Sequence, residues 1–270
     1  MLENPRSPRV RAVAKLTKRS ARTETGLFLL EGPQSVREAL TYRPEAIVEL
    51  FATPHGWEKH ADIRAAAAEA DVDVEYVSED VLHAMADTVT PQGLVAVVRQ
   101  TPTSVRDIFD AAPRLVAICE EVRDPGNLGT IIRAADAAGA DAVVLTGRTV
   151  DPYNPKVVRA TTGSLFHLPV SVGGELDEVV GRAHDAGLQI LAADVKGDDL
   201  LAARADGVLG EPTAWLFGNE ARGLEDEALT QADRVLRLPI FGRAESLNLA
   251  TAASVCLYES AFAQRAASTG

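Results

Sequence analysis

The sequence has 270 residues, of which 46% are hydrophobic, 24% charged and 5% aromatic, and its formal net charge is −12. This composition excludes a disordered or fibrous chain, and the length suffices for two hydrophobic cores. No apolar run reaches the roughly 20 residues of a membrane-spanning helix, and no signal peptide is recognisable, so we expect a cytoplasmic protein with no membrane contact.

The first 22 residues are basic, in contrast to the acidic remainder of the chain. They hold seven Lys or Arg side chains and one acid, Glu3, so the rest carries a formal charge of −18. Such a segment predicts local contact with a polyanion, and the alternative is a solvated, frayed terminus. We treat residues 1–22 as a basic arm whose candidate contact residues are Arg9, Arg11, Lys15, Lys18, Arg19 and Arg22.

Residues 23–100 alternate between extended and helical patterns. The strand-like runs are 26–32, 46–52, 72–77 and 93–98, and the helical stretches are 34–40 and 58–70. Ser78 is a suitable cap for a further short helix whose apolar positions are Leu82 and Met85. The alternation predicts a small α/β domain.

A second α/β pattern follows a linker at 101–112, which ends in a short helix over 105–111. Its strand-like runs are 115–119, 142–145, 167–170, 189–193, 213–217 and 234–238, and a long helix over about 249–267 comes last. Continuous apolar strands separated by helices predict a mostly parallel sheet covered on both faces. We therefore expect a second domain over 113–270, although the order of its strands does not follow from the spacing.

Several familiar site motifs are missing. No G-x-G-x-x-G follows a strand, and neither a P-loop nor a G-x-S-x-G elbow occurs. The five histidines are scattered without ligand spacing, and two cysteines, Cys119 and Cys256, cannot build a disulfide framework or a four-ligand zinc site. We expect no metal.

The loop at 120–135 is the first of three unusual segments that follow predicted strands. Asn127 can cap a helix that runs to Ala138 and stops at Gly139. Capping accounts for Asn127 and Gly139, but it leaves Arg133 unexplained in an otherwise small and apolar helix.

The other two segments are 215–224 and 238–253. In the first, a buried strand runs into Gly218, which permits close backbone approach to a ligand or a tight turn. In the second, Ser246 or Asn248 can cap the terminal helix, but capping does not explain why both flank the apolar Leu247 directly after a Gly-Arg pair.

Together, the three segments resemble the motifs of SPOUT-class RNA methyltransferases, and more narrowly those of the TrmH/SpoU group of RNA 2′-O-ribose methyltransferases. The matching text is N-L-G-T-I-I-R-A-A-D-A-A-G, F-G-N-E-A-R-G-L and L-P-I-F-G-R-A-E-S-L-N-L-A-T-A-A, in this order. The resemblance covers roughly residues 115–262. F-L-L-E-G-P-Q-S-V-R-E-A-L and T-P-Q-G-L-V-A-V-V resemble the ribosomal-protein-like substrate-binding domain that many members carry.

The resemblance implies an α/β SPOUT fold with a mostly parallel sheet and a C-terminal trefoil knot, beside a small N-terminal α/β domain. It implies a homodimer in which two subunits complete each active site, with the terminal helix around residues 255–258 as the dimer contact. Core packing is the alternative for that helix.

The implied cofactor is S-adenosylmethionine (AdoMet), held by the loops of the knot. Its predicted binding residues are Leu216, Phe217, Gly218, Asn219, Glu220, Leu238, Ile240, Gly242, Ser246, Leu247 and Asn248.

The resemblance gives Arg133 the central catalytic role, which is to contact the ribose 2′-oxygen and stabilise its negative charge. Asn127 and Asn248 would fix the loops and the hydroxyl, and Ser246 would orient Arg133. Glu220 would pair with an arginine or anchor the knot. The proton acceptor stays open, since a guanidinium is a poor acceptor.

The implied substrate is ribosomal RNA of the large subunit (23S), with antibiotic resistance or housekeeping as its purpose. Arg133, Arg159, Arg222 and Arg243 are candidates to extend the basic face towards the RNA, with surface decoration as the alternative for Arg159. The rival interpretations are a tRNA ribose 2′-O-methyltransferase and an RNA-binding protein that has kept the fold without activity.

Overall fold

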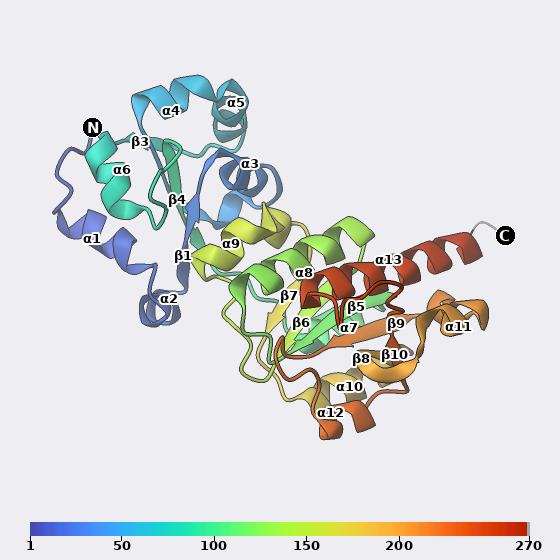
Figure 1. Cartoon of the computed structure of the whole chain (residues 1–270). Helices are drawn as coiled ribbons and strands as arrows, with labels where there is room; N and C mark the ends of the chain where they lie inside the picture. The colour runs from blue at the N-terminus through green and yellow to red at the C-terminus, as the bar shows by residue number, and fades with distance from the viewer. Residues whose placement is uncertain (269–270) are drawn as a thin grey trace. The chain divides into compact units, whose positions relative to one another are not determined.

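The computed structural model describes residues 1–268, which form two compact units (Figure 1). The first unit contains residues 1–101 and 151–167, and the second contains 102–150 and 168 onwards. None of the helices in the described part of the chain has both the length and the apolar composition to cross a membrane.

The first unit is an α/β unit with a mixed sheet of four strands in the order β1-β4-β2-β3. β4 pairs antiparallel with β1 and β2, whereas β2 and β3 are parallel. Its elements are α1 (Pro8–Lys15), α2 (Arg19–Thr25), β1 (Leu27–Glu31), α3 (Pro33–Tyr42), β2 (Ile47–Ala52), α4 (Pro54–Lys59), α5 (Ala61–Glu69), β3 (Val74–Tyr76), α6 (Glu79–Met85), β4 (Leu94–Arg99) and α9 (Pro155–Thr161).

Alternating side chains of β1 and β4 build two separate cores on the faces of this sheet. Phe28 and Leu30 join the core that contains α3 and α5, whereas Leu29 between them joins the core that contains α1 and α6. A strand sends successive side chains to opposite faces, so a fully apolar strand needs cover on both sides. The helices on each face provide that cover.

The predicted basic arm is part of this folded unit and not a separate segment. Val10, Val13 and Leu16 lie on one side of α1 and are buried with α6, because their spacing places them on a single helix face. Arg22 is only 2% exposed, and its guanidinium binds Asp151 and the carbonyl oxygens of Leu16 and Thr17. The prediction that Arg22 contacts RNA is therefore wrong.

The segment 151–167, which the sequence prediction assigned to the second domain, belongs to the first unit. Tyr153, Val158 and Phe166 bury their side chains in the core that contains α3, and the Phe28 and Tyr153 rings lie 4.9 Å apart. A 3-10 helix over Ser164–Phe166 comes first here, so strand β7 begins only at Val170 and not at the predicted residue 167.

The second unit is built on a six-stranded sheet in the order β10-β8-β9-β5-β6-β7, in which all neighbouring strands are parallel. The prediction of a mostly parallel sheet is confirmed. The elements are α7 (Val105–Asp110), β5 (Leu115–Glu120), α8 (Pro125–Ala138), β6 (Ala142–Thr146), β7 (Val170–Val172), α10 (Leu176–Asp185), β8 (Gln189–Asp199), α11 (Leu200–Ala205), β9 (Thr213–Phe217), α12 (Asp226–Thr230), β10 (Arg234–Arg237) and α13 (Leu249–Ser268).

Helices cover both faces of this sheet. Val116, Ile118 and Leu216 pack with α7 and α10 on one face. On the other face α8 and α13 lie side by side (Figure 1), and the indole Nε1 of the buried Trp215 donates to Ser260 Oγ of α13 at 2.9 Å. Parallel strands direct their carboxyl ends to one edge, where the connecting loops gather. The first and second motif segments, 120–135 and 215–224, contain the carboxyl ends of β5 and β9 and therefore lie at that edge.

We expect the Arg22–Asp151 pair to be a large contributor to the stability of the first unit. Asp151→Ala leaves a buried guanidinium without its carboxylate, so the free energy of unfolding should fall by about 3 kcal/mol or more. Asp62→Ala is the matched control, because it breaks the more exposed Arg37–Asp62 pair in the same unit and should cost less than about 1 kcal/mol. Urea unfolding of the full chain gives both values, and equal losses would contradict the prediction.

Candidate active site

The first turn of α8 is capped by Asp124. The prediction that Asn127 caps this helix is therefore wrong. The Asp124 carboxylate accepts a hydrogen bond from the backbone N–H of Asn127 at 2.8 Å, and Pro125 occupies the first helical position. Gly139 ends the helix with φ of +75°, as predicted. Because Asp124 performs the capping, the side chain of Asn127 is available for another contact.

Asn127 uses this freedom to bind Asn248, which joins the first motif to the third. The Asn248 Nδ2 donates to Asn127 Oδ1 at 2.9 Å, although the two residues are 121 positions apart. The Asn248 Oδ1 accepts from the backbone N–H groups of Ala250 and Thr251, so the same side chain caps α13. One amide thus fixes the start of α13 against the start of α8.

The second motif is tied to the first by Glu220 and Asn219. The Glu220 carboxylate accepts from the backbone N–H groups of Arg123 and Asp124 at 3.1 and 2.9 Å, directly before α8. Asn219 Nδ2 donates to the carbonyl of Glu121. Glu220 makes no ion pair with an arginine side chain in the described residues, so of its two predicted roles only the anchoring of a loop has a matching contact.

Gly218 is needed for the turn of the motif segment itself. A Cβ on Gly218 would lie 2.5 Å from the backbone carbon of Gly223, which no side chain tolerates. Asn219 and Gly223 exchange backbone hydrogen bonds of 3.0 and 2.8 Å across the loop. The close backbone approach predicted at Gly218 is therefore to its own loop.

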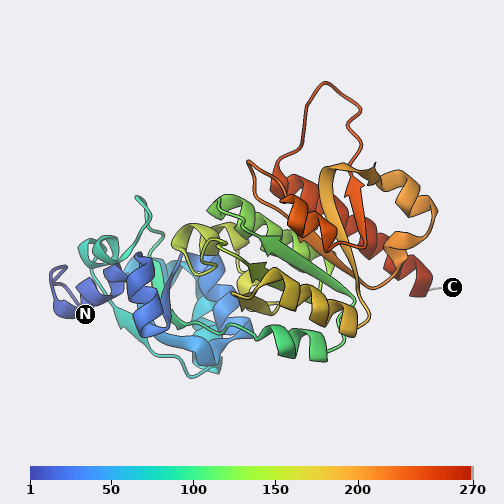
Figure 2. The same ribbon diagram turned by 90° about the horizontal axis from the view of Figure 1, so that it is seen from below.

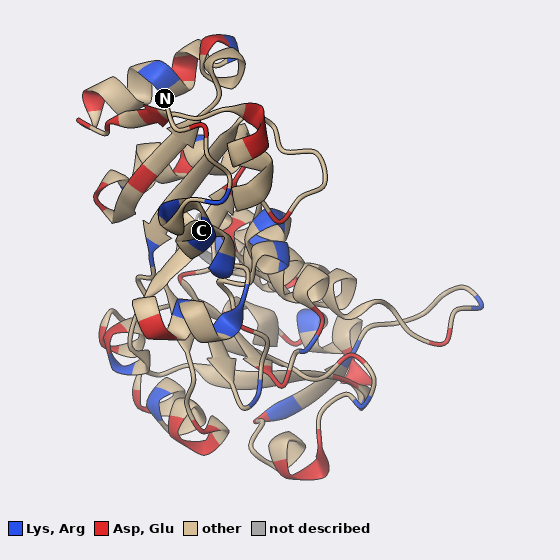
Figure 3. Ribbon diagram, turned by 90° about the vertical axis from the view of Figure 1, so that its left-hand side faces the viewer, with Lys and Arg blue, Asp and Glu red and all other residues tan. Residues whose placement is uncertain are grey.

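The segment between β10 and α13 stands away from the body of its unit (Figures 2 and 3). Figure 3 shows basic and acidic positions near its tip, and the segment contains Arg243 and Glu245. Ile240, Phe241 and Leu247 are exposed, with Phe241 at 88%. No hydrogen bond joins the backbone of residues 238–247 to any other residue that the structure describes. This segment therefore offers apolar side chains together with unpaired backbone donors and acceptors.

Arg133 lies on the exposed side of α8 and has no hydrogen bond or ion pair within residues 1–268. Ser246 is also exposed, and no contact joins it to Arg133. Of the five predicted catalytic residues, hydrogen bonds thus link Asn127 to Asn248 and Glu220 to the backbone before α8. Arg133 and Ser246 remain open to a ligand or a partner subunit.

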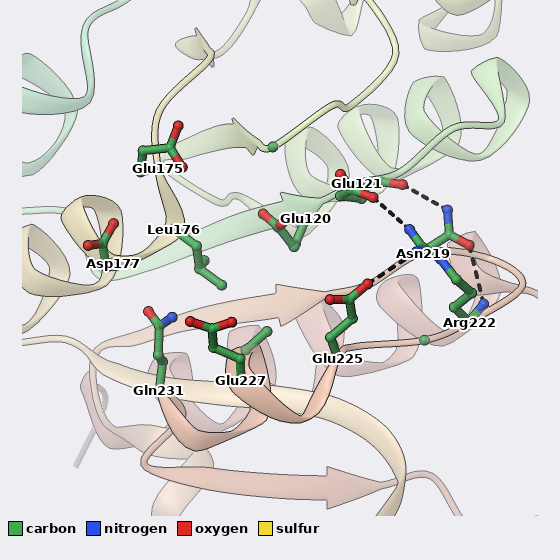
Figure 4. A pocket seen from close by; sticks show the side chains of 13 residues that line it. Glu120, Glu121, Glu175, Leu176, Asp177, Asn219, Arg222, Glu225, Glu227 and Gln231 are labelled. Carbon is green, nitrogen blue, oxygen red and sulfur yellow. Dashed lines mark hydrogen bonds and ion pairs between the residues drawn. The ribbon is translucent and has the colours of Figure 1, made fainter.

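An acidic cavity of about 370 Å³ lies at the carboxyl edge of the sheet, beside the second motif (Figure 4). Asn219, Arg222 and Gly223 line it, whereas Gly218, Ile240 and Leu247 do not. One cation, Arg222, faces six acids in the lining: Glu120, Glu121, Glu175, Asp177, Glu225 and Glu227. Such a lining repels phosphate and attracts cations. Among residues 1–268, no group of His, Cys, Asp or Glu has an arrangement that could hold a metal ion.

Two neighbouring carboxylates of this cavity differ in their surroundings. Burial raises the pKa of Glu120, and the nearby charges of Glu121, Glu175 and Glu225 raise it further. The Arg123 and Arg222 guanidinium groups lower the pKa of Glu121, with hydrogen bonds of 3.2 and 2.6 Å. Arg222 also binds Glu225, so this arginine is engaged with acids and is not a free basic side chain.

The comparison with protein families shows to which family the chain belongs. Residues 114–258 match the SpoU rRNA methylase family, and residues 29–104 match the RNA 2′-O ribose methyltransferase substrate-binding domain. The chain belongs to the SpoU rRNA methylase family. The family resemblance predicted from the three motifs is confirmed.

Proteins similar to this SpoU family member along most of its length include two named enzymes. The chain described here is 34% identical to the 23S rRNA (guanosine(2553)-2′-O)-methyltransferase RlmP of Bacillus subtilis, over 95% of this chain and 97% of the relative. It is 33% identical to the 23S rRNA (uridine(2479)-2′-O)-methyltransferase of Streptomyces viridochromogenes, over 91% and 86%. The crystal structure of an AdoMet-bound rRNA methyltransferase from Sinorhizobium meliloti matches with a TM-score of 0.82 and 34% identity, covering 96% of both chains.

Sequence reasoning missed the acidic cavity of this SpoU protein. A signal was present, because Glu120 and Glu121 directly follow a predicted strand and Glu225 and Glu227 follow the second motif. Their convergence depends on β5 and β9 being neighbours in the sheet, and the strand order did not follow from the sequence.

We expect Glu120→Gln to stabilise the protein at neutral pH. A carboxyl group whose pKa is raised in the folded state contributes stability below its ordinary pKa, and this is lost as the pH rises through the raised value. The variant should therefore melt at a higher temperature than the parent at pH 7, and the difference should close as the pH falls below about 4.5, the ordinary pKa of a glutamate.

Glu121→Gln is the matched control, with the opposite sign. The pKa of Glu121 is lowered in the folded protein, so its carboxylate contributes stability at pH values above the ordinary pKa of a glutamate. This stability is lost as the pH falls through the lowered pKa. The variant should therefore melt at a lower temperature than the parent at pH 7. Thermal melts of both variants from pH 4 to pH 8 check the pair, and shifts of the same sign would refute the electrostatic account.

Proposed function

We propose that this chain transfers the methyl group of AdoMet to a ribose 2′-hydroxyl of 23S ribosomal RNA. The observation that carries the proposal is the linkage of the three family motifs at the first turn of α8, through Asn248–Asn127 and Glu220. Relatives that are named for this reaction align along 91–95% of the chain, including its first unit.

The segments predicted to bind AdoMet have the chemistry that a nucleoside needs. Exposed Ile240 and Leu247 can cover the two faces of an adenine ring, and the unpaired backbone groups of 238–247 can bind its polar edge. The second motif supplies Leu216, Phe217, Gly218, Asn219 and Glu220, and the third supplies Leu238, Gly242, Ser246 and Asn248 as well. AdoMet provides a methyl group that is already activated on a sulfonium.

Arg133 stabilises the charge that develops on the 2′-oxygen. Its guanidinium has no partner in the described residues, so its donors are available to a substrate oxygen. A guanidinium has no acceptor lone pair at neutral pH, so a water molecule or a phosphate of the RNA takes the proton. Holding the hydroxyl in line with the methyl group lowers the barrier by several kcal/mol.

The other motif residues position these groups. The side-chain hydrogen bond between Asn127 and Asn248 holds the starts of α8 and α13 together. Glu220 fixes the second motif to the residues before α8. Ser246 orients Arg133 when the third motif closes on its ligands. The proposed fold includes the C-terminal trefoil knot of the family, and the tight backbone approach of Gly197 to Val235 is compatible with it.

The exposed basic side chains of α1 and α2 contact the RNA backbone. Arg11, Lys15, Lys18 and Arg19 are exposed and form no ion pair in the described part of the chain, whereas Arg9 binds Glu49 and Glu75. Such contacts supply affinity that falls with salt and carry little sequence information. A ribosomal substrate implies that the protein works where ribosomes are assembled, which in bacteria is the cytoplasm.

The active protein is a homodimer that associates through α13. Val255, Tyr258 and Phe262 are exposed on one face of this helix, at the spacing i, i+3 and i+7, and the last two rings lie 5.5 Å apart. An apolar stripe of this kind needs cover. A second subunit on this face would lie next to the exposed face of α8 that carries Arg133, because α8 and α13 are neighbours.

Arg133→Ala should reduce the rate of methyl transfer to ribosomal RNA by at least 100-fold, because it removes the donors that stabilise the developing oxyanion. AdoMet affinity, measured by calorimetry, should change less than threefold. Arg106→Ala is the matched control, since it removes an exposed arginine from α7 of the same unit and should leave both values unchanged. Turnover of Arg133→Ala close to that of the parent would remove this residue from the mechanism.

Val255→Asp should convert the dimer to a monomer, because a desolvated carboxylate in the centre of an apolar contact is costly. Sedimentation velocity measures the change, and methyl transfer should fall with the loss of dimer. Leu201→Asp is the control, because it adds the same charge at another exposed apolar position of this unit. A Val255→Asp variant that stays dimeric would exclude α13 from the interface.

A further inference from the structure

Glu121 has a backbone conformation that residues other than glycine rarely adopt. It follows β5 directly, and its φ is +53°. Among residues 1–268, three other non-glycine residues have a positive φ: Asp71, Ala112 and Thr162. These three follow the ends of α5, α7 and α9, where a left-handed residue commonly closes a helix. Glu121 follows a strand, so its strained conformation needs another cause.

Contacts with the second motif accompany this conformation (Figure 4). The backbone carbonyl of Glu121 accepts a hydrogen bond from Asn219 Nδ2 at 2.9 Å, and its carboxylate accepts one from Arg222 Nη2 at 2.6 Å. Both donors belong to the loop that follows β9. An extended residue directs its carbonyl along the sheet and its side chain to one face. The carbonyl and the carboxylate of Glu121 instead bind a single loop.

The two partners of Glu121 also determine the shape of this loop. Asn219 Oδ1 accepts hydrogen bonds from the backbone N–H groups of Ala221 and Arg222 at 3.0 and 3.2 Å. Arg222 Nη1 binds the Glu225 carboxylate at 3.1 Å, and Glu225 is the residue at which α12 begins. Glu121 is therefore bound to the side chains that connect the two ends of the loop.

The loops after β5 and β9 bind each other in both directions. Glu121 accepts hydrogen bonds from two side chains of the loop after β9. Glu220 of that loop accepts hydrogen bonds from the two backbone N–H groups directly before α8, the helix that carries Arg133. The place of the second motif relative to α8 is therefore fixed by one carboxylate from each loop.

From these contacts we propose that Glu121 is a positioning residue for the AdoMet site. Its left-handed backbone and its carboxylate hold the second motif, with Gly218 and Glu220, in place beside the start of α8. Without the carboxylate, residue 121 can relax towards an extended conformation, and the loop then loses its contacts. AdoMet would bind only those molecules in which the loop is correctly placed, which lowers its apparent affinity. The inference rests on the proposed function, because it takes the second motif to bind AdoMet.

Glu121→Ala and Glu121→Gly separate the backbone conformation from the carboxylate. Both variants lack the carboxylate, but glycine adopts a positive φ without strain and alanine does not. In calorimetry on the full-length protein, the AdoMet affinity of Glu121→Ala should be at least fivefold below that of the parent. The affinity of Glu121→Gly should be at least twofold above that of Glu121→Ala. In methyl transfer, the KM for AdoMet should follow these affinities, and kcat at saturating AdoMet should stay within twofold of the parent.

Ala112→Gly is the matched control in the same unit. Ala112 has a φ of +52°, close to that of Glu121, but it follows α7. Its change to glycine should raise the melting temperature, because it relieves the same strain, and should leave the AdoMet affinity unchanged. Glu121→Gln is the conservative variant. Its side-chain carbonyl can still accept from Arg222, so it should bind AdoMet more tightly than Glu121→Ala does.

A purely structural role of Glu121 would change the melting temperature and not the binding of AdoMet. Variants that melt at a lower temperature but bind AdoMet as the parent does would therefore overturn the inference alone. Equal affinities of Glu121→Ala and Glu121→Gly, or a changed affinity of Ala112→Gly, would overturn it as well. A parent protein that neither binds AdoMet nor methylates ribosomal RNA would refute the proposed function together with the inference.

Discussion

The arrangement of the second unit depends on hydrogen bonds to the backbone N–H groups at the start of α8. A helix begins with N–H groups that have no intrahelical acceptor, and here side chains from distant segments supply acceptors around them. Asp124 accepts within the turn, and Glu220 accepts from the two residues before it. Because two carboxylates perform these tasks, Asn127 can bind Asn248. The motifs of three distant segments therefore meet at one helix start.

The sequence predicted correctly those helices and strands that depend on the pattern of neighbouring residues. The runs at 115–119 and 213–217 are apolar and continuous, and both are strands with nearly the predicted bounds. The prediction that Asn127 caps α8 was wrong because Asp124, three residues earlier, is an equally suitable cap. The sequence alone does not decide between the two side chains. The membership of 151–167 in the first unit depends on which core receives Tyr153 and Phe166, and that is a long-range choice.

The charges on the surface of the protein favour cations in one place and anions in another. The acidic cavity at the edge of the second sheet disfavours phosphate. Four exposed cations without an ion pair in the described residues favour it: Arg11, Lys15, Lys18 and Arg19. Arg159 and Arg222, both candidates for a basic face, are engaged with Glu31 and Glu121. An acidic protein can thus contact RNA through a few exposed cations, while its acids repel the polyanion from other surfaces.

The exposed third motif supports the proposed homodimer. Ile240, Phe241 and Leu247 are apolar and exposed on a segment whose backbone is unpaired, and the nearby α13 exposes Val255 and Phe262. Exposed apolar surfaces of this kind usually mark places where a ligand or another chain binds. A nucleoside is small enough to cover the first but not the second, whereas another copy of α13 can cover the second. In the proposed dimer, a cofactor would cover the first surface and a second subunit the other, and Arg133 on the neighbouring α8 would lie beside both.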